Sequence, residues 1–481
     1  MKKRWIILWI CILLLPNILS AQKRLKFKEG KFLIAQFTDL HWQPRSPGCT
    51  ETAATIRKVL KSERPDLAVI SGDVVTGDPA IDGWKAIVAL FDEAKIPFVV
   101  TMGNHDGEHM KKEDIYNFLL QSPYYVGEKG PKEIMGCGNC VLPVYSSKNG
   151  EKLEALVYCI DSNDYRSEKA YGPYDWIHFN QIEWYRRQSS EFRSKNNGKP
   201  LPALAFFHIP LPEYNELVGK QQKFGNDMDR EVGAALINSG MFASFIDMRD
   251  VMGVFTGHDH NNDYIGINKG IALAYGRLSG KDAGGSLERG ARIIELEEGK
   301  FQFNTWISTP IGREPIYYYP SGVNSKEENC LKYQAAQQLS AKQNGVMYTY
   351  YVGKCRQVSQ IASCRKVKEG VLPNFSIGQA EAVDHFAYEF VTFLQIPERG
   401  VYNFYTFSDD GSVLYIDDNL VVNNDGGHSA QRADGKIALE KGFHKLRLLY
   451  FEDYMGQELE VGYSGRKIPE TTLTASQLFL P

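Results

Sequence analysis

The sequence predicts an α/β domain over residues 31–308, followed by an all-β domain over residues 345–481. In the first region, short apolar runs alternate with helix-like intervals, an order that favours parallel strands joined by helices. In the second region nearly every apolar run is strand-like, and glycine-containing turns separate several of the runs. The chain is thus expected to form two domains of different fold class.

Five apolar runs of the first domain are expected to be buried strands: Phe32–Phe37, Leu67–Ile70, Phe98–Thr101, Ala203–Phe207 and Val251–Phe255. Helices are expected near the first three of them, at Glu51–Lys61, Ile81–Lys95 and Lys111–Leu120. Polar residues directly follow most of these strands. Because ligands bind at the carboxyl ends of parallel strands, we expect those polar residues to gather along one edge of the sheet.

Further strands and helices complete the first domain. A stripe of Phe179, Ile182, Tyr185 and Phe192 predicts an amphipathic packing helix, and a short helix is expected at Phe242–Arg249. The other apolar runs predict strands, the last four of them antiparallel: Val141–Ser146, Leu153–Ile160, Tyr264–Ile267, Ile271–Tyr275, Ala291–Glu297 and Phe301–Ile307.

Residues 309–344 are expected to link the two domains. Thr309-Pro310 and Glu314-Pro315 interrupt regular structure, and a Gln- and Ala-rich run that follows predicts a helix around Asn329–Ala341. The strands expected in the second domain are Tyr388–Ile396, Val401–Phe407, Val413–Ile416, Leu420–Asn423, His444–Phe451 and Glu458–Tyr463.

The composition is that of an ordinary globular protein. The chain has 481 residues, of which 43% are hydrophobic and 23% are charged, and this length suits two or three domains with full cores. The formal net charge is −3. A mildly acidic chain with no basic stripe gives no support to nucleic-acid binding.

Residues 1–21 have the three zones of a secretory signal peptide. Basic residues at positions 2–4 precede the apolar run Trp5–Leu15, and Leu19-Ser20-Ala21 offers a cleavage site. The apolar run is shorter than the roughly 20 residues that span a bilayer, so cleavage is favoured over an uncleaved anchor. We therefore expect a secreted or periplasmic protein with no stable membrane span after cleavage.

The cysteines suit an exported protein, because export permits disulfides. Cys355 and Cys364, close together in a loop-rich stretch, are the pair expected to form one. Cys137 and Cys140 form a single CxxC with no second pair nearby, which favours a local disulfide or two core cysteines over a zinc knuckle.

Short polar blocks follow the expected strands, and together they suit a pair of metal ions. The blocks are Asp39-Leu40-His41, Gly72-Asp73, Gly103-Asn104-His105-Asp106, His208 and Gly257-His258-Asp259-His260. Two divalent cations about 3.5–4 Å apart need oxygen and imidazole ligands and one bridging group. Asp73 has the room to bridge them, and Asn104 offers a neutral amide oxygen. Asp39 and His41 can reach one metal only if the chain curls there.

His105 and Asp106 are expected to be catalytic rather than metal-binding residues. His105 directly follows a ligand and so points toward the substrate, where a protonated imidazole suits donation to a leaving-group oxygen. Asp106 is expected to hold that imidazole in one tautomer. The expected nucleophile is a metal-bound hydroxide, since the cations lower the pKa of water.

Taken together and in this order, the five blocks resemble those of the calcineurin-like metallophosphoesterase superfamily over roughly residues 31–307. The resemblance implies a four-layer αββα sandwich with a dinuclear metal centre. It implies one metal held by Asp39, His41, Asp73 and His260, and another held by Asp73, Asn104, His208 and His258. The local sequence around Asp39 and His208 is most similar to that of bacterial enzymes near the purple acid phosphatases.

One position departs from the purple enzymes, which have a tyrosine three residues after the bridging aspartate. This chain has Thr76 there, so the tyrosinate–iron colour is not expected, and iron, manganese and zinc all stay open. The resemblance implies hydrolysis of phosphate esters. Phosphomonoesters are favoured as substrates, and the alternative is diesters of nucleotide or lipid type.

Two loop regions, residues 107–130 and 161–175, are expected to shape the substrate pocket. Tyr165, Arg166 and Tyr171 are candidates to stack on or pair with a substrate. The alternative is that they are exposed loop residues that do neither.

The second domain resembles the protective-antigen-type β-sandwich module over about residues 345–465, chiefly in Tyr405–Asp417 and Asn424–His428. In sugar-binding members of that family, two adjacent aspartates hold a calcium ion that coordinates glycan hydroxyls, and Asp409 and Asp410 match those positions. Hard oxygen ligands suit calcium. The alternative is a plain Asp-Asp-Gly turn between two strands, which needs no metal.

The favoured function is an exported metal-dependent phosphoric ester hydrolase whose second domain binds a glycan or packs against the first. The alternative from another class is a non-catalytic glycan-binding protein with a decayed hydrolase domain. The complete ligand set argues against decay, because the loss of a ligand would be its expected mark.

Overall fold

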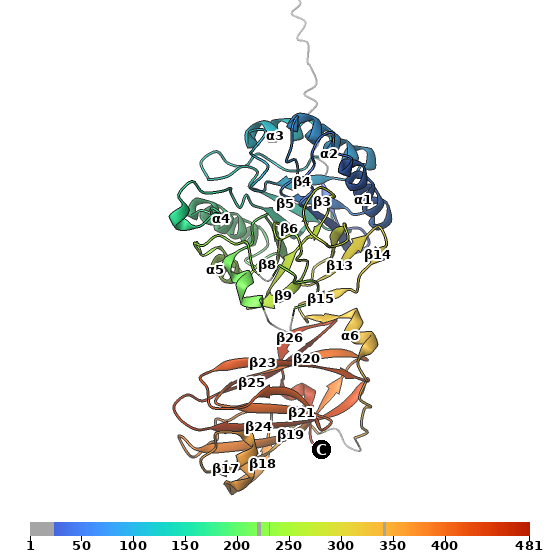
Figure 1. Cartoon of the computed structure of the whole chain (residues 1–481). Coiled ribbons are helices and arrows are strands. Elements are labelled where there is room, and N and C mark those ends of the chain that lie inside the picture. The colour runs from blue at the N-terminus through green and yellow to red at the C-terminus, as the bar shows by residue number, and fades with distance from the viewer. Residues whose placement is uncertain (1–23, 219–222, 230, 340–342) are drawn as a thin grey trace, which may run out of the picture.

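The computed structural model describes residues 24–218, 223–229, 231–339 and 343–481. Two domains follow each other along the chain, and Figure 1 shows the α/β domain above the all-β domain. The expected signal peptide at residues 1–21 lies outside the described residues. In the described part of the chain, no helix is both long and apolar enough to cross a membrane.

One mixed sheet of the first domain is built around its earliest strands. The strands are β2 Lys31–Thr38, β3 Leu67–Ser71, β4 Phe98–Thr101, β11 Arg277–Leu278, β12 Ala291–Glu297, β13 Phe303–Thr309, β14 Gly312–Arg313, β15 Tyr317–Tyr319 and β16 Val323–Asn324. Their order is β16-β15-β13-β12-β2-β3-β4, with β11 beside β2 and β14 beside β13. The strands β2, β3 and β4 run parallel, as predicted, and β12 pairs antiparallel with β2.

A second mixed sheet packs against the first. Its strands are β1 Leu25–Lys26, β5 Cys140–Tyr145, β6 Leu153–Cys159, β7 Ala203–Phe206, β8 Val251–Thr256, β9 Ile265–Asn268 and β10 Ile271–Tyr275, in the order β1-β5-β6-β7-β8-β10-β9. The strand β10, expected to be antiparallel, runs parallel to β8 because the short strand β9 first reverses the chain.

Helices cover both outer faces, so the domain is a four-layer αββα sandwich. The helices α1 Gly48–Glu63, α2 Ala80–Ala94 and α3 Lys112–Leu119 cover the first sheet, and α4 Phe179–Lys195 and α5 Met241–Met248 cover the second (Figure 1). Successive residues of a strand point to opposite faces. In β2, Phe32 therefore faces the other sheet, whereas Phe37 faces the helices. Burial of an aliphatic side chain such as Ile56 in α1 stabilises the domain by about 1.5–3 kcal/mol.

The predicted stripe of α4 is right except at its first position. Ile182 and Tyr185 are buried in the core between α4 and its sheet, and Phe192 packs against that core. Phe179, the first residue of the helix, is exposed. Trp184 contributes to the core in its place.

The polar strand ends meet at an edge shared by the two sheets rather than at the edge of one sheet. Gln36 of β2 donates a hydrogen bond across this boundary to the carbonyl oxygen of Thr256 in β8, at 3.0 Å. The apolar runs predict β2, β3, β4, β7 and β8 correctly but carry no information on which sheet a strand joins. The site described below is therefore assembled from both sheets.

The segment expected to be a linker begins as part of the first domain. Tyr317 and Tyr319 of β15 pair with Thr305 and Phe303 of β13, and β16 pairs with β15. A short helix, α6 Ser325–Cys330, follows. Pro310 and Pro315, which predict a linker here, lie in the connections before and after the two-residue strand β14, where a missing N–H is tolerated.

The helix expected over residues 329–341 is wrong for the described residues 331–339. Gln334 and Gln337 instead form backbone bridges to Leu439 and Phe443 of the second domain. Pairing with a neighbouring strand edge has overridden the helix propensity of the Gln- and Ala-rich run, because propensity is only a weak preference.

The second domain is a sandwich of two antiparallel sheets. Its strands are β17 Val346–Val352, β18 Arg365–Leu372, β19 Phe386–Ile396, β20 Gly400–Asp409, β21 Ser412–Ile416, β22 Asn419–Asn424, β23 Gln431–Leu439, β24 Gly442–Glu452, β25 Glu458–Gly465, β26 Ile468–Thr472 and β27 Leu478–Phe479. One sheet has the order β18-β17-β19-β24-β21-β22 with β27 beside β19, and the other has the order β23-β20-β25-β26. Phe390 and Leu448 of the first sheet and Phe404 of the second belong to the core between them.

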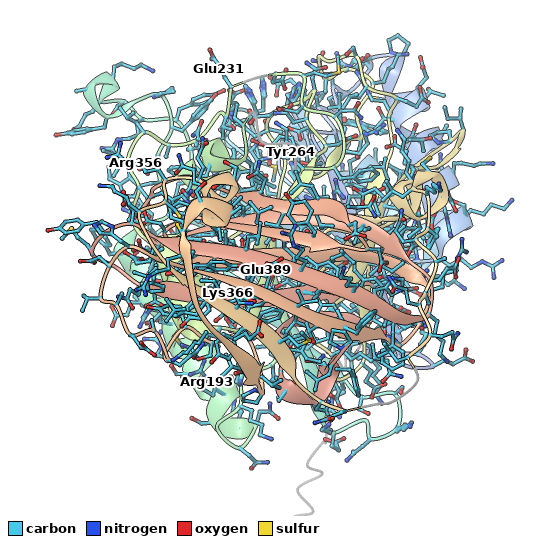
Figure 2. All side chains as sticks on the ribbon, turned by 90° about the horizontal axis from the view of Figure 1, so that it is seen from below. Arg193, Glu231, Tyr264, Arg356, Lys366 and Glu389 are labelled. Atoms are coloured by element: carbon cyan, nitrogen blue, oxygen red, sulfur yellow. The ribbon has the colours of Figure 1, made fainter. Side chains whose placement is uncertain are left out.

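The two sheets of the sandwich face different surroundings. Seen from below, the sheet that contains β18 and β19 is turned toward the viewer, with Lys366 and Glu389 on it (Figure 2). The other sheet contacts the first domain, where Val401 and Ala438 pack with Tyr318 and Val323.

The cysteines of the described chain are all thiols. The Sγ atoms of Cys355 and Cys364 lie 3.0 Å apart, so the predicted partners meet but the predicted disulfide is not formed. Cys140 lies opposite Cys159 across β5 and β6.

Candidate metal centre

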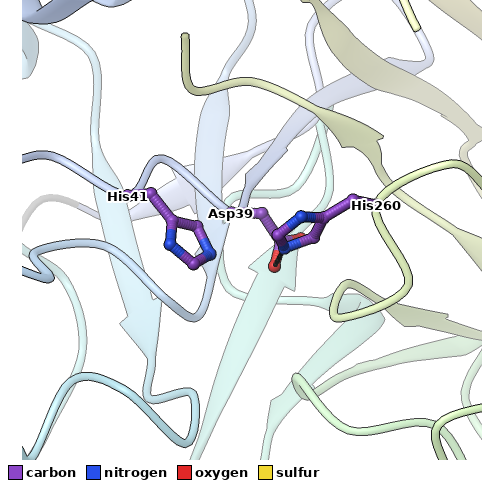
Figure 3. A group of neighbouring side chains, drawn as sticks. All are labelled: Asp39, His41 and His260. Atoms are coloured by element: carbon purple, nitrogen blue, oxygen red, sulfur yellow. Dashed lines mark ion pairs between the residues drawn. The ribbon is translucent and has the colours of Figure 1, made fainter. Parts of the chain in front are cut away.

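One group of possible metal ligands comes from two strand ends. Asp39 and His41 follow β2, His260 follows β8, and each residue places a ligand atom within 4.8 Å of the others. The Nε2 atom of His260 is 3.4 Å from Oδ1 of Asp39. Figure 3 shows both imidazole rings beside the Asp39 carboxylate. One carboxylate and two imidazoles suit iron, manganese or zinc.

A second group comes from three strand ends. Asp73 follows β3, His208 follows β7 and His258 follows β8, again with ligand atoms within 4.8 Å of one another. Nε2 of His208 is 3.1 Å from Oδ2 of Asp73 and 3.3 Å from Nδ1 of His258. The Nδ1–H of His208 donates to the carbonyl oxygen of Ser71 at 2.8 Å. This bond directs Nε2 into the site, the usual support for a metal-binding histidine.

Asp73 lies between the two groups. Its Oδ2 atom is 3.7 Å from Nε2 of His41 and 3.1 Å from Nε2 of His208. Nε2 of His208 is also 3.9 Å from Oδ1 of Asp39. One carboxylate therefore faces both groups, which is the arrangement that a bridging ligand requires.

Two buried atoms of the site lack a hydrogen-bond partner within the described part of the chain: Nε2 of His41 and Oδ1 of Asn104. A buried polar atom left unpaired costs about 1–3 kcal/mol, and native proteins contain few of them. Cations held by the two groups would satisfy both atoms. The residues present therefore fit a pair of metal ions.

The backbone is bent where the ligands are. Asp39, His41, Asp73 and His258 have φ values of 51°, 41°, 50° and 80°, a region that non-glycine residues rarely adopt. Positive φ at both Asp39 and His41 supplies the curl that their spacing demands. Residues in such conformations cluster at functional sites, where the surrounding structure holds them in place.

Two of the glycines in the polar blocks are needed because neighbouring residues approach them too closely for a side chain. A Cβ atom at Gly103 would collide with Asp73, and one at Gly257 would collide with Thr38 and Asp39. The loops that carry Asn104 and His258 can approach the carboxylates only because these positions have no side chain.

Electrostatics divide the histidines into two kinds. Burial and the charge of His208 lower the pKa of His258 to about 3, and burial lowers the pKa of His41. For His208, burial opposes the proton, but Asp73 and Asp39 outweigh it and raise the pKa to about 10. The carboxylates thus hold a positive charge among them, a role that bound metal cations would take over.

His105 lies beside the two groups, and both of its ring nitrogens are engaged. Its Nδ1–H donates to Oε1 of Glu108 at 2.8 Å, and its Nε2 lies 3.1 Å from the Tyr165 hydroxyl, to which it donates when the imidazole is protonated. A turn in which the Glu108 N–H donates to the His105 carbonyl oxygen brings the glutamate back beside the imidazole. The His105 side chain is 32% exposed, so an incoming group can reach it.

Asp106 does not have the role predicted for it. Its Oδ1 accepts the N–H groups of Val74 at 2.8 Å and Val75 at 3.3 Å, and its Oδ2 accepts the N–H of Gly103 at 2.8 Å. Its carboxylate ties the loop after β3 to the loop after β4. The expectation that it orients His105 is therefore wrong, and a glutamate three residues after His105 contacts that imidazole instead.

The loop after β6 supplies an aromatic wall to the site. The Tyr165 ring stacks on the Tyr174 ring with centroids 5.7 Å apart. The Tyr174 ring in turn packs edge-on against His258, at 4.6 Å.

The other two loop residues expected near the substrate turn away. The Arg166 guanidinium lies over the Trp176 ring at 4.5 Å and pairs with Asp175 at 2.9 Å. Tyr171 lies against Arg166, with the ring centroid 5.6 Å from the guanidinium carbon. Its partner is thus in its own loop.

A separate acidic cluster lies in the second domain, where β20 turns into β21. Asp409, Asp410 and Glu452 place carboxylate oxygens within 4.8 Å of one another. The N–H groups of His428 and Asp453 donate to Asp410 at 2.9 and 2.8 Å. Glu452 is fully buried, and its Oε1 has no partner in the described part of the chain. Burial, together with Asp410 and Asp409, raises the pKa of Glu452 to about 8.

Comparison with known proteins agrees with this geometry. The family model described as calcineurin-like phosphoesterase matches residues 32–262. An Arabidopsis thaliana protein named probable inactive purple acid phosphatase 29 is 34% identical over 331 residues, which cover 62% of this chain and 85% of the relative. The chain belongs to the calcineurin-like phosphoesterase family. The PA14 domain model matches residues 342–475, so a PA14 domain, here a β-sandwich, follows the phosphoesterase domain.

Two further similarities concern the phosphoesterase domain. The phosphatase DCR2 of Saccharomyces cerevisiae is 31% identical over 329 residues, which cover 60% of this chain and 56% of the relative. Among solved structures, a dimetal phosphatase from Danio rerio aligns over 59% of this chain and 98% of its own, with 12% identity and a TM-score of 0.42. The family and the two ligand groups support a centre for two metal ions.

Three residues near these sites were not predicted from the sequence. Glu108 of the phosphoesterase domain depends on a turn that returns it to His105. Tyr174 lies in a loop that was expected to shape the pocket, but only the backbone pairing decides which tyrosines face inward. Glu452 of the PA14 domain directly follows an expected strand, and an acidic residue at that place was an available signal.

Proposed function

We propose that the phosphoesterase domain hydrolyses phosphate esters with two metal ions and that phosphomonoesters are its substrates. The observation that carries this proposal is the Asp73 carboxylate, which faces both ligand groups at 3.7 Å from His41 and 3.1 Å from His208. The side chains proposed to hold the ions are Asp39, His41, Asp73, Asn104, His208, His258 and His260.

His105 is the proposed general acid. When bound, the metal ions would supply charge that polarises the phosphate and activates a water molecule. The water oxygen bonds to phosphorus as the bond from phosphorus to the leaving-group oxygen breaks, and Nε2 of the protonated His105 gives that oxygen its proton. The proton that the water loses restores the charged imidazole. Glu108 accepts from Nδ1 at 2.8 Å and so directs Nε2 toward the leaving group.

A rival proposal is that the hydrolase domain has decayed and that the protein only binds glycans. The name of the Arabidopsis thaliana relative, which calls that protein probably inactive, gives this rival weight. The geometry supports activity instead, because all the proposed ligands are present and two of their atoms are buried without a hydrogen-bond partner in the described chain.

Hydrolysis assays on the metal-loaded chain decide between these proposals. Iron, manganese and zinc should each be tested on p-nitrophenyl phosphate and on bis-p-nitrophenyl phosphate. The proposal predicts a higher kcat/KM for the monoester, and a higher value for the diester would favour nucleotide- or lipid-type diesters. Inactivity on both esters with every metal would favour the decayed hydrolase. The position of Thr76 predicts no purple colour in the iron-loaded protein.

We also propose that the protein is exported to the periplasm or beyond the cell. The support is the basic, apolar and small-residue order of residues 1–21. Determination of the N-terminus after expression of the whole chain tests it. A mature chain that begins at Gln22 is expected, and a chain retained in the cytoplasm with Met1 or Lys2 at its start would contradict export.

For the PA14 domain, we propose glycan binding through a calcium ion held by Asp409 and Asp410. The specific support is Glu452, a buried carboxyl with one oxygen that no described residue satisfies. Calcium takes several carboxylate and carbonyl oxygens, which this cluster can offer. Calcium titration of the whole chain and of Asp410→Asn, followed by glycan-array binding with and without EGTA, tests the proposal. Equal binding in all cases would mean a plain turn and a packing domain.

A further inference from the structure

The hydroxyl of Tyr165 lies where an oxygen of a substrate has to come. It is 3.1 Å from Nε2 of His105, the atom proposed to give a proton to the leaving group. The ring neighbour of Tyr165, Tyr174, packs edge-on against His258, a proposed metal ligand, at 4.6 Å. Tyr165 therefore lies beside the proposed acid, at the edge of the proposed metal centre.

Tyr165 is held in this place before any substrate arrives. Its ring stacks on Tyr174 at 5.7 Å, and the two residues form a backbone bridge. On one side of the bridge the Arg166 N–H donates to the Pro173 carbonyl oxygen at 2.9 Å, and on the other the Asp175 N–H donates to the Asp164 carbonyl oxygen at 2.8 Å. A group fixed in this way loses little conformational freedom when it binds a ligand.

The base of the loop is also fastened to the rest of the domain. Lys112 of α3 pairs with Asp161 at 3.4 Å and with Asp164 at 3.2 Å. Its side chain is 13% exposed, so this is a sheltered contact. The residue just before Tyr165 is therefore tied to the helix that follows the His105 loop.

We propose that Tyr165 is a substrate-binding residue that leaves His105 and donates a hydrogen bond to a phosphate oxygen. The proposal rests on the function proposed for this centre. A phenol keeps its proton at neutral pH and is a hydrogen-bond donor. Because the ring and the backbone of Tyr165 are already held in place, only the hydrogen bond of the hydroxyl has to change partner when the negative charge of a phosphate arrives. The departure of the hydroxyl also frees Nε2 of His105 to meet the leaving group.

The variant Tyr165→Phe tests the proposal because it removes the hydroxyl and keeps the ring stack. Tyr171→Phe is the matched control, since Tyr171 lies in the same loop and is 47% exposed against 43% for Tyr165. The metal-loaded full chain and both variants are titrated calorimetrically with inorganic phosphate and assayed on p-nitrophenyl phosphate. A hydrogen bond to a charged acceptor corresponds to a loss of about 10- to 100-fold. We expect this loss in phosphate affinity and in kcat/KM for Tyr165→Phe, with less than a twofold change for Tyr171→Phe and the metal content unchanged in both.

The outcomes separate this inference from the function on which it rests. Equal phosphate affinity and equal kcat/KM in Tyr165→Phe and the control would overturn the inference alone. A gain in activity would also overturn it, because the tyrosine would then be blocking the site. If the wild-type protein binds phosphate but hydrolyses no ester, the proposed function is refuted, and the phosphate titration alone decides on Tyr165. If the wild-type protein neither binds phosphate nor hydrolyses an ester, both proposals are refuted.

Discussion

Replacement of Asp106 by alanine tests whether this carboxylate fastens two loops or orients His105. The carboxylate is 1% exposed and accepts three backbone N–H groups, at 2.8, 3.3 and 2.8 Å. Alanine would leave those three donors without a partner. Because they belong to the loops after β3 and β4, the change should loosen the backbone that carries Asp73 and Asn104.

The size of the effect follows from two opposing contributions. An unpaired buried donor costs about 1–3 kcal/mol, so three of them cost about 3–9 kcal/mol. Against this, burial and the charge of Asp73 raise the pKa of Asp106 to about 6. Because alanine removes that disfavoured charge from the folded protein, the substitution also stabilises the variant by about 3 kcal/mol. The two contributions leave a net cost of about 0–6 kcal/mol, and since water will satisfy some of the donors, we expect Asp106→Ala to lower the free energy of unfolding by about 1–4 kcal/mol.

Denaturant unfolding, metal analysis and kinetics should be measured together on Asp106→Ala and on Glu108→Ala. Glu108 makes one contact to His105 and its side chain is 42% exposed, so Glu108→Ala should change stability by less than about 0.5 kcal/mol. Asp106→Ala should lose stability and bound metal, and its rate should fall by a similar factor on all substrates. Wild-type stability and metal content in Asp106→Ala, with a loss of rate confined to poor leaving groups, would mean that Asp106 orients His105 and does not fasten the loops.

Three further changes have defined outcomes. His105→Ala should keep both metals and lose roughly 10²–10⁴ in kcat, less for esters with acidic leaving groups; a loss that is uniform across aryl phosphates would count against the acid. Asp73→Asn should lose metal and activity together, and retention of either one alone in metal analysis and assay would speak against the bridge. For Glu452 the pKa rises from an ordinary 4.5 to about 8. The folded PA14 domain therefore keeps a proton that the unfolded chain releases, so its stability in EGTA is greatest below pH 4.5 and falls as the pH rises to about 8, by up to about 1.4 kcal/mol per pH unit. Melting curves should show this slope, and it should vanish in Glu452→Gln; an equal slope in both would contradict the buried carboxyl.

The ligand groups could be predicted because the physics of strand ends is simple. Asp39, Asp73 and His208 each come within two residues of the end of a buried strand. Parallel strands bring such positions together whatever the details of the loops. What the apolar runs could not show is that β2 and β3 belong to one sheet and β7 and β8 to another, because burial on both faces looks the same in either sheet.

Side-chain direction within the loops could not be predicted. Asp106 and Glu108 are both acidic and both close to His105 in sequence. The turn at His105 directs the nearer one into the backbone and the farther one to the imidazole. Such a turn depends on the contacts of the whole loop, including those with Val74 and Val75, rather than on its own residues.

The boundary between the domains was obscured by weak local signals. The edge strands around Tyr317–Tyr319 are short and lie beside prolines, so their pairing with β13 is not visible in the sequence. The helix expected over residues 329–341 depended on composition, and contacts of Gln334 and Gln337 with the second domain outweighed it. In both cases tertiary pairing decided the structure.

Seven side chains from two sheets are proposed to hold two metal ions that share Asp73. Anomalous diffraction from metal-loaded crystals, collected at the absorption edge of the bound metal, locates the ions. We expect two peaks, one beside Asp39, His41 and His260 and one beside His208 and His258, with Asp73 between them. A single peak, or none near Asp73 at saturating metal, would contradict this proposal.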